Sequence, residues 1–257
     1  MKDNRKDKSQ PKEGIIAGRN PVLEALKSKT PPEKIFVAKG EKEGSIVRII
    51  SLARELKIPI SEADRVKLDF MAGIPTHQGV VAYTSQKSYV SVEEILEYAE
   101  LKGEPPFIII ADEINDPHNL GAIIRTAEAS GVHGIIISKN RSVSVTPAVV
   151  KASAGAVMHM RMAKVSNIAD TIVRLKKLGL WIYGTDASAT QDIYSTDFKG
   201  PVGIVIGNEG SGISRLVKER CDFLLSIPMK GKISSLNASV AAGIMMYEVL
   251  RQRNLNI

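Results

Sequence analysis

The sequence GIVIGNEGSGIS at 203–214, followed by LLSIPMKGKISSLNASVAAGIMMY at 224–247, decides the fold of this chain. Each piece begins with apolar residues typical of a buried strand and is then broken, the first by the Gly-rich turn at 207–212 and the second by Pro228. The small residues that follow, from Ala238, predict a helix. Two strands that end in glycines and polar side chains are typical of the edge where an α/β sheet binds its ligand, so we expect the ligand site here.

The composition indicates a globular protein without a membrane span. The chain has 257 residues, 44% hydrophobic and 25% charged, so that it can bury one large core or two smaller ones. No window approaches about 18 consecutive apolar residues. Residues 1–13 predict a disordered basic tail, because they have charge but no apolar core of a secretory signal. A single cysteine, Cys221, excludes an internal disulfide and fits a reducing compartment, so we expect a cytoplasmic protein.

The charge of the chain favours an anionic partner. The net charge is +7, although a basic surface that only promotes solubility explains the same number. Aromatic residues make up 5% of the chain, which leaves few platforms for stacking on bases. If the partner is a nucleic acid, we expect contacts with its phosphates and recognition of its shape to dominate.

Residues 14–84 predict a small α/β unit, which a linker at 85–90 joins to a second domain at 91–257. The predicted helices are 20–27, 45–56 and 63–71, and the predicted strands are 34–38, 58–60 and 79–84. Four polar residues at turns are candidate ligand contacts: Arg19, Asn20, His77 and Gln78. For His77, which precedes a strand, we favour a structural or solvated role over contact with a ligand. The unit carries no nucleophile–base pair, so we expect it to bind rather than to catalyse.

The second domain alternates strands with helices. Besides the two strands of the opening stretch, strands are predicted at 107–111, 134–138, 157–160 and 180–185, and helices at 93–101, 120–131, 147–153, 168–178 and 238–253. The run FIIIA at 107–111 is apolar at every position, as in a parallel sheet covered on both faces. This order predicts a doubly wound α/β domain.

The Gly-rich turn does not match the common nucleotide-binding motifs. GNEGSG spaces its glycines as GxxGxG, not in the dinucleotide order GxGxxG, and Gly231-Lys232 is followed by isoleucine rather than serine or threonine. The sequence also lacks HExxH, GxSxG, CxxC and EF-hand patterns, so neither a metal site nor serine acyl transfer is expected. Taken alone, the turn is better explained by a helix cap and tight packing than by a ligand site.

Three loops together carry a specific resemblance. The sequences NLGAIIRTAEASG at 119–131, IVIGNEGSGIS at 204–214 and IPMKGKISSLNASVAAGIMMYE at 227–248 resemble the three motifs of the SpoU/TrmH class of RNA ribose 2′-O-methyltransferases. The N-terminal sequences IIAGRNPVLEAL at 15–26 and THQGVVAY at 76–83 are similar to the ribosomal-protein-like RNA-binding module of the bacterial 23S rRNA guanosine 2′-O-methyltransferases. The four turn residues of the first unit thereby become candidate RNA contacts.

The resemblance implies a fold, a cofactor and a site. It implies an α/β trefoil-knot domain, an exception to the rule that chains are unknotted, preceded by a small α/β RNA-binding domain. It also implies S-adenosylmethionine as cofactor and a homodimer with RNA as partner. The implied cofactor-binding residues are Gly207, Ile227 and Leu236, with Thr185, Asn208 and Met229 as further candidates. The implied catalytic residues are Asn119, Arg125, Glu209, Ser235 and Asn237.

The identity of the general base is the open point of the mechanism. Ordinary pKa values favour His118, because arginine stays protonated in proteins, whereas the resemblance assigns the role to Arg125. Our hypothesis is that Arg125 binds the 2′-oxygen and the adjacent phosphate, with Asn119 and Glu209 holding its guanidinium. The alternative for Arg125 is a surface ion pair with Glu128 or Asp116. For Ser235 and Asn237 the alternative is capping of the last helix, and for Glu209 a solvated position in the turn.

Three functions remain open from the sequence. The first is methylation of a ribose 2′-hydroxyl in RNA, with a guanosine of 23S rRNA as the expected target. The second is the same chemistry on a tRNA loop. The third is a non-catalytic RNA-binding factor in ribosome assembly, which the intact Asn119, Arg125, Glu209 and Asn237 disfavour.

Overall fold

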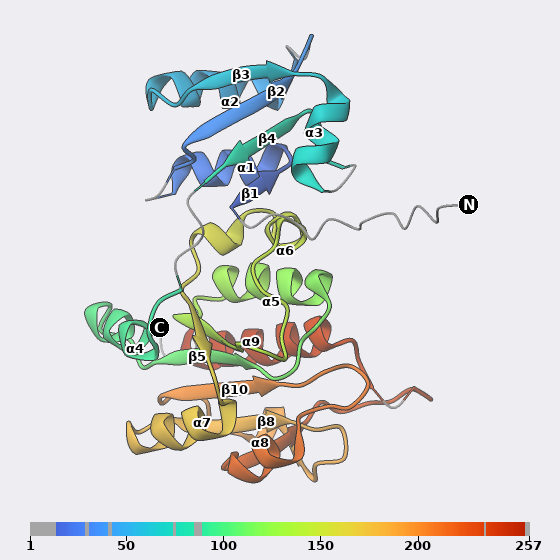
Figure 1. Cartoon of the computed structure of the whole chain (residues 1–257). Coiled ribbons are helices and arrows are strands. Elements are labelled where there is room, and N and C mark those ends of the chain that lie inside the picture. Colours follow the sequence, from blue (N-terminus) through green and yellow to red (C-terminus); the bar gives the residue numbers. More distant parts are fainter. Residues whose placement is uncertain are drawn as a thin grey trace. The chain divides into compact units, whose positions relative to one another are not determined.

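The computed structural model describes residues 14–28, 31–40, 43–73, 76–84, 89–233 and 235–254 (Figure 1). The predicted tail at 1–13 and most of the predicted linker at 85–90 lie outside these residues. The chain forms two compact units. The first contains the described residues before the linker together with Val145–Met158, and the second contains Ser88–Ser144 and the residues from His159 onward.

The first unit is built around a four-stranded mixed sheet in the order β1-β4-β2-β3. Its elements are β1 (Ile15–Ala17), α1 (Arg19–Lys27), β2 (Lys34–Ala38), α2 (Ser45–Glu55), β3 (Ile60–Ala63), α3 (Arg65–Ala72) and β4 (Val80–Tyr83). Strand β4 runs antiparallel to both β1 and β2, while β2 and β3 are parallel. All the predicted helices and strands of this unit have a counterpart, but the strand predicted at 58–60 lies at Ile60–Ala63 and the helix predicted from 63 begins at Arg65. Strand β1 is additional, because three residues are too few to show an alternating pattern.

Val145–Met158 packs in the first unit, although the sequence assigns it to the 91–257 domain. It forms helix α6 (Pro147–Ala152) and the 3₁₀ turn η1 (Ala156–Met158). At Gly155, where φ is +92°, an added Cβ would lie 2.8 Å from Cβ of Glu24, so only glycine allows this approach to α1. Lys151 donates a hydrogen bond to the Thr76 hydroxyl.

The second unit is a seven-stranded sheet in the order β7-β6-β5-β10-β8-β11-β9, and every pairing is parallel. Its strands are β5 (Phe107–Ala111), β6 (Gly134–Ser138), β7 (Met162–Val165), β8 (Trp181–Thr185), β9 (Gln191–Asp192), β10 (Val202–Ile206) and β11 (Phe223–Ser226). Strand β10, the first of the opening stretch, lies at the centre between β5 and β8. Because all strands run in one direction, their carboxyl ends share one edge.

One predicted strand is misplaced. The strand expected at 157–160 is wrong: these residues begin in the η1 turn, and β7 follows at Met162–Val165. The apolar alternation in VMHMRMAKV continues through both places, so periodicity cannot choose between them. The short, polar β9 carries no apolar pattern and is not predicted.

Helices cover both faces of this sheet. They are α4 (Val92–Leu101), α5 (Pro117–Ala129), α7 (Ile168–Lys177), the unpredicted α8 (Arg215–Arg220) and α9 (Ala238–Asn254). Residues of α4, α7 and α8 share one apolar cluster with the strands. Helices α5 and α9 pack against each other on the opposite face (Figure 1). Helix α5 begins with Pro117 at its first position, and the Asp116 carboxylate caps it by accepting from the His118 backbone N–H at 2.9 Å.

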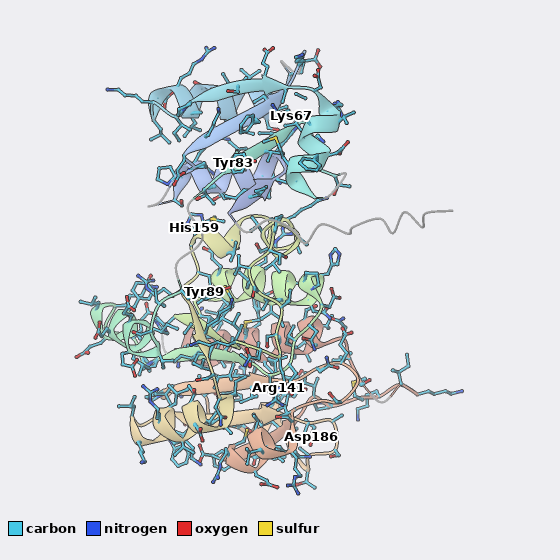
Figure 2. All side chains as sticks on the ribbon, viewed as in Figure 1. Lys67, Tyr83, Tyr89, Arg141, His159 and Asp186 are labelled. Atoms are coloured by element: carbon cyan, nitrogen blue, oxygen red, sulfur yellow. The ribbon has the colours of Figure 1, made fainter. Side chains whose placement is uncertain are left out.

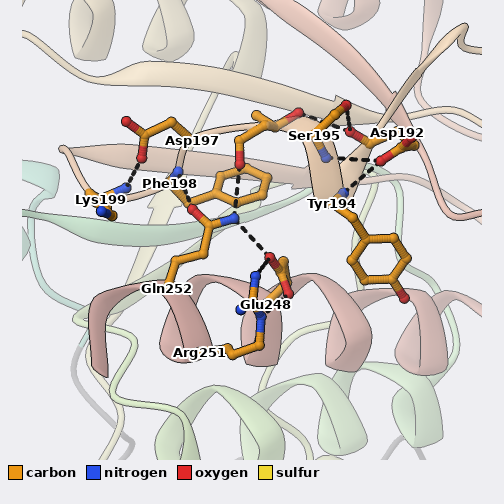
Figure 3. A network of polar contacts seen from close by, with 10 residues as sticks. Asp192, Tyr194, Ser195, Asp197, Phe198, Lys199, Glu248, Arg251 and Gln252 are labelled. Atoms are coloured by element: carbon orange, nitrogen blue, oxygen red, sulfur yellow. Dashed lines mark hydrogen bonds and ion pairs between the residues drawn. The ribbon is translucent and has the colours of Figure 1, made fainter. Parts of the chain in front are cut away.

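The end of α9 is anchored to the sheet by a buried amide. Gln252 Oε1 accepts from the Phe198 backbone N–H at 2.9 Å, and its Nε2 donates to the Thr196 carbonyl at 2.8 Å and to Glu248 Oε1 at 2.7 Å (Figure 3). Arg251 pairs with the same Glu248 carboxylate. These bonds fix the helix whose first turn borders the candidate site.

Candidate active site

A cavity of about 550 Å³ opens where the central strands β10, β8 and β11 end. Pockets of this size commonly hold small molecules. All six residues predicted to bind the cofactor line it: Thr185, Gly207, Asn208, Ile227, Met229 and Leu236. Glu209 and Ser235, two of the predicted catalytic residues, line it as well. The structure thus brings together loops that the sequence separates.

The Gly-rich turn forms one wall of the cavity. Asn208 and Gly212 exchange two backbone hydrogen bonds, of 3.0 and 2.8 Å, which close the turn. An added Cβ at Gly207 would lie 2.2 Å from the carbonyl carbon of Gly212 and 2.3 Å from the nitrogen of Ile213. Backbone therefore passes directly over Gly207, and no other residue fits there.

The turn is tied to the loop that follows β5. Asn208 Nδ2 donates to the Glu113 carbonyl at 3.1 Å, and the Ser214 backbone N–H donates to Asp112 Oδ2 at 2.7 Å. Glu113 has a φ of +57°, which is uncommon for a residue with a side chain. These bonds hold the start of α5, and with it Asn119, beside the cavity.

Three predicted catalytic residues form a hydrogen-bonded triangle. Asn119 Nδ2 donates to Glu209 Oε1 at 2.7 Å, and Asn237 Nδ2 donates to Asn119 Oδ1 at 3.0 Å. Asn237 Nδ2 also contacts Glu209 Oε1. In addition, Asn237 Oδ1 accepts from the Ser239 backbone N–H at 2.9 Å, so it caps α9 while it holds the triangle. One residue from each of the three sequence motifs is joined here.

Arg125 lies outside this triangle. Its side chain is exposed on α5 and makes no hydrogen bond or ion pair within the described part of the chain. The expected contacts of its guanidinium with Asn119 and Glu209 are therefore not formed, because these two residues bind each other and Asn237. The alternative ion pair with Glu128 or Asp116 is not formed either. All five donor hydrogens of the guanidinium are available to a ligand.

An ion pair that the sequence did not single out also borders the cavity. Asp186 follows β8 and pairs with Lys218 of α8, and both residues line the cavity wall. The hydrogen bond from Lys218, together with those from Ser188, lowers the pKa of Asp186 from 3.8 to about 2. The position of Asp186 after a sheet strand, next to the predicted Thr185, was the available signal.

Two family models match this chain. Residues 106–247 match the model of the SpoU rRNA Methylase family, and residues 15–90 match the model described as RNA 2′-O ribose methyltransferase substrate binding. The chain belongs to the SpoU rRNA methylase family. The family inferred from the motifs is confirmed, and the protein is a SpoU-class RNA methyltransferase with an N-terminal substrate-binding domain.

Relatives of this SpoU protein match along nearly its whole length. Bacillus subtilis YacO, named as a TrmH family tRNA/rRNA methyltransferase, is 48% identical over 239 residues, which cover 93% of this chain and 96% of YacO. A Staphylococcus aureus protein named to the same family is 44% identical over 240 residues, covering 93% of this chain and 96% of the relative. The crystal structure of the SpoU methyltransferase AviRb from Streptomyces viridochromogenes with AdoMet has a TM-score of 0.78 at 27% identity, covering 94% of this chain and 90% of AviRb.

The turn residues of the SpoU substrate-binding unit form a connected group. Arg19 donates from its backbone N–H to Gln78 Oε1 at 3.1 Å and from Nε to the Gln78 carbonyl at 3.0 Å, and the neighbouring Asn20 is exposed. His77 is buried, with its ring only 3% exposed, so of the roles considered for it the structural one is confirmed and it is not placed to contact RNA. Its Nδ1 accepts from the Gly79 N–H at 3.0 Å and its Nε2 lies 3.2 Å from Asp69, which is a structural role.

Two further features bear on what the SpoU protein binds. None of the helices in the described ranges is long and apolar enough to cross a membrane. The described residues also contain no group of three or more His, Cys, Asp or Glu that could hold a metal ion.

Proposed function

We propose that this protein transfers the methyl group of S-adenosylmethionine to a ribose 2′-hydroxyl of RNA, and that the target is a guanosine of 23S rRNA. The observation that supports the reaction is the contact between the cavity and the triangle of Asn119, Glu209 and Asn237. The proposal includes a trefoil knot in the second unit and a homodimer, as the motifs imply, and a cytoplasmic location, which the single cysteine fits.

The cavity fits the proposed cofactor in size and chemistry. Apolar side chains of Leu225, Ile227 and Leu236 suit an adenine ring, while exposed backbone of the Gly-rich turn offers hydrogen-bonding groups. The carboxylates of Glu209 and Asp186 face the same space and favour the positive charges of the cofactor. When bound, the cofactor supplies an electrophilic methyl group, so that the protein has to align the ribose and stabilise the charge that develops on its oxygen.

Arg125 is the residue to which we assign the stabilisation of that charge. Its unpaired guanidinium can bind the 2′-oxygen and a neighbouring phosphate with separate donors, which favours the alkoxide over the alcohol. Asn119, Glu209 and Asn237 position the loops around the reaction rather than the guanidinium itself. Ser235 is exposed at the cavity and is placed to contact the ribose or the cofactor.

The role of Arg125 is tested by Arg125→Ala, Arg125→Lys and His118→Ala, measured by methyl transfer from labelled S-adenosylmethionine. We expect both Arg125 variants to lose about 100-fold or more in kcat, because a lysine lacks the planar fork, and His118→Ala to stay active. Near-normal turnover of Arg125→Lys together with a loss in His118→Ala would reverse the assignment.

The RNA target is tested separately. YacO carries a name that covers both tRNA and rRNA, and an Aquifex aeolicus TrmH/SpoU tRNA modifying enzyme matches 64% of this chain and 84% of its own with a TM-score of 0.54 at 29% identity. We expect ribose-methylation mapping of total RNA from cells with and without the gene to lose one site in 23S rRNA. A lost tRNA site with an unchanged rRNA profile selects the tRNA alternative. Calorimetry without any binding of S-adenosylmethionine would favour the assembly factor.

A further inference from the structure

A long segment of the chain carries charge of one sign only. Between Glu128 and Asp170 there is no aspartate or glutamate, although acidic residues occupy 28 of the 257 positions. The same segment contains five cations, namely Lys139, Arg141, Lys151, Arg161 and Lys164. Three of them, Lys139, Arg141 and Lys164, lie together in the second unit at the ends of β6 and β7, and we call these three residues the basic rim.

The loop that follows β6 holds the basic rim together. The Lys139 backbone N–H donates to the Val165 carbonyl at 2.9 Å, which extends the pairing of β6 with β7. Lys164, in β7, donates from Nζ to the Ser144 hydroxyl at 2.8 Å. Both ends of the loop are thus fixed to the same strand, and the three cations share one edge of the sheet.

The cations of the rim remain available to a ligand. Lys139 is exposed, and its ammonium group makes no hydrogen bond or ion pair with any residue that the structure describes. The Arg141 side chain is 74% exposed, and Glu113 occupies only its Nη1, at 2.8 Å. Lys164 is half-buried, with its ammonium group 4.3 Å from the centre of the Tyr89 ring, and it uses one of its three donors on Ser144.

The rim adjoins the candidate active site through the loop after β5. The Val143 backbone N–H donates to the Ile114 carbonyl at 3.0 Å, and Arg141 pairs with Glu113 of the same loop. The Glu113 carbonyl in turn accepts from Asn208 Nδ2 in the cavity wall. Arg141 and the cavity residue Asp186, both labelled in Figure 2, follow the carboxyl ends of β6 and β8 and so belong to one edge of the sheet.

We propose that the basic rim binds the phosphodiester backbone of the substrate RNA beside the nucleotide in the active site. The proposal rests on the RNA methyltransferase function proposed above. A ribose 2′-hydroxyl is always flanked by phosphates, so a strand that reaches the cavity carries negative charge along the adjoining surface. Cations with unused donors and no acidic side chain in their segment match that charge, and their contribution is independent of sequence.

The test compares the full-length protein with the variant Lys139→Ala/Arg141→Ala/Lys164→Ala by fluorescence anisotropy, using a short labelled single-stranded RNA at several salt concentrations. Each lost phosphate contact lowers the slope of log K against log salt by about 0.7 for single strands. We therefore expect the slope to fall by about 2 and the Kd to rise about 100-fold at about 0.1 M salt. The KM for in vitro transcribed 23S rRNA should rise in parallel.

Two single variants show whether a loss of RNA binding comes from the missing charge of the rim or from a change in its structure. Lys177→Ala removes an exposed lysine at the end of α7, which leads into the opposite edge of the sheet, and should leave the RNA Kd unchanged. Glu113→Gln breaks the Arg141 ion pair while it keeps the cation, so it should bind RNA as tightly as the unaltered protein or more tightly. An equal weakening in Glu113→Gln would mean that the rim acts by shaping the loop, and it would overturn the proposal.

Other results of these measurements also support or overturn the proposal. A triple variant with unaltered Kd and salt slope overturns the proposal. If the triple variant fails to fold, as judged by circular dichroism, Lys139→Ala alone should still lower the slope by about 0.7, because this ammonium group supports no other described residue. Calorimetric binding of S-adenosylmethionine is measured on each variant. Its absence in the unaltered protein would reject the proposed function, while the RNA binding data would still decide on the rim.

Discussion

Asn119 and Glu209 are 90 positions apart in the sequence, yet Asn119 Nδ2 donates to Glu209 Oε1 at 2.7 Å. Asn237 completes the group from a third loop, because its Nδ2 donates to the side-chain Oδ1 of Asn119 at 3.0 Å. Because Asn119 is 7% exposed, an unpaired amide here would be costly, and the bond is strongly favoured. The loops around the cavity are therefore fixed to one another by their own polar side chains, and Arg125 is left free.

The first prediction concerns this bond. In Asn119→Asp a carboxylate replaces the amide donor and faces the Glu209 carboxylate, so like charges separate the two loops. A displacement of about 1 Å at a reacting centre can cost about 100-fold, and we expect a loss of that order in the single-turnover rate of methyl transfer. Glu209 and its turn line the cavity, so the Kd for S-adenosylmethionine should rise as well. An unaltered rate would show that the bond has no part in positioning.

The second prediction concerns the Gly-rich turn. In Gly207→Ala the methyl group would overlap the backbone of Gly212 and Ile213, so the turn has to move away from the cavity. We expect a loss of about 1–3 kcal/mol in the free energy of unfolding and at least tenfold weaker binding of S-adenosylmethionine by calorimetry. Gly210→Ala is the matched control, because its Cβ would meet nothing closer than Asn208 Oδ1 at 3.6 Å. Equal effects in the two variants would contradict the steric argument.

The third prediction is a pH dependence caused by Asp186. Its pKa lies near 2 in the folded protein, below the ordinary 3.8, because Lys218 donates to it and Ser188 adds two hydrogen bonds. A lowered pKa stabilises the folded state above about pH 4, and this stabilisation is lost as the pH falls toward 2. The shift corresponds to at most about 2 kcal/mol. Solvent screening reduces that figure, because the Lys218 side chain is 40% exposed.

Urea unfolding of the unaltered protein and of Asp186→Asn between pH 6 and 2 checks this dependence. The difference in unfolding free energy between the two proteins should be constant above about pH 4 and shrink below it. A difference that does not change with pH would mean that Asp186 acts through its shape and not through its charge. Lys218→Met, which removes the cation but keeps much of the side-chain length, should show the same pH dependence as Asp186→Asn.

The sequence predicted the lining of the cavity because local signals mark it. Thr185 ends a strand whose apolar run is readable, and Asn208 and Ile227 follow two other such strands. Parallel strands bring their carboxyl ends to one edge. The motifs then selected residues within those loops. The same reasoning found the helices of both units except the short α8, since their caps and apolar stripes are local as well.

The features that could not be predicted from the sequence depend on contacts between residues far apart in the chain. The packing of Gly155 against Glu24 and the pairing of Asp186 with Lys218 join positions that no local pattern relates. Asn119 donates to Glu209 and does not contact the Arg125 guanidinium. Which of the two partners it binds depends on their positions in space, and no local pattern in the sequence indicates this. The misplaced strand at 157–160 has another cause, because two neighbouring apolar alternations were equally good candidates for one strand.

The fourth prediction concerns the single cysteine. Burial, and to a smaller extent the nearby Asp222, raise the pKa of Cys221 to about 12, so the thiolate is scarce near neutral pH. We expect Cys221 to react with a disulfide reagent much more slowly in the native protein than in urea, and methyl transfer to persist while it is unmodified. Fast native modification at pH 8 would show that α8, which precedes Cys221, opens readily.

The last prediction concerns the anchor at the end of α9. Gln252→Leu keeps an apolar side chain of similar length but removes the partners of the buried Phe198 N–H and of the Thr196 carbonyl. A buried polar group without a partner costs about 1–3 kcal/mol, so this variant should lose about 2–4 kcal/mol in unfolding free energy measured with urea. Arg251→Lys is the control, because it keeps a cation beside Glu248 and leaves the amide of Gln252 in place, so it should matter far less. Equal losses in the two variants would show that the ion pair with Glu248, and not the amide of Gln252, holds the helix in place.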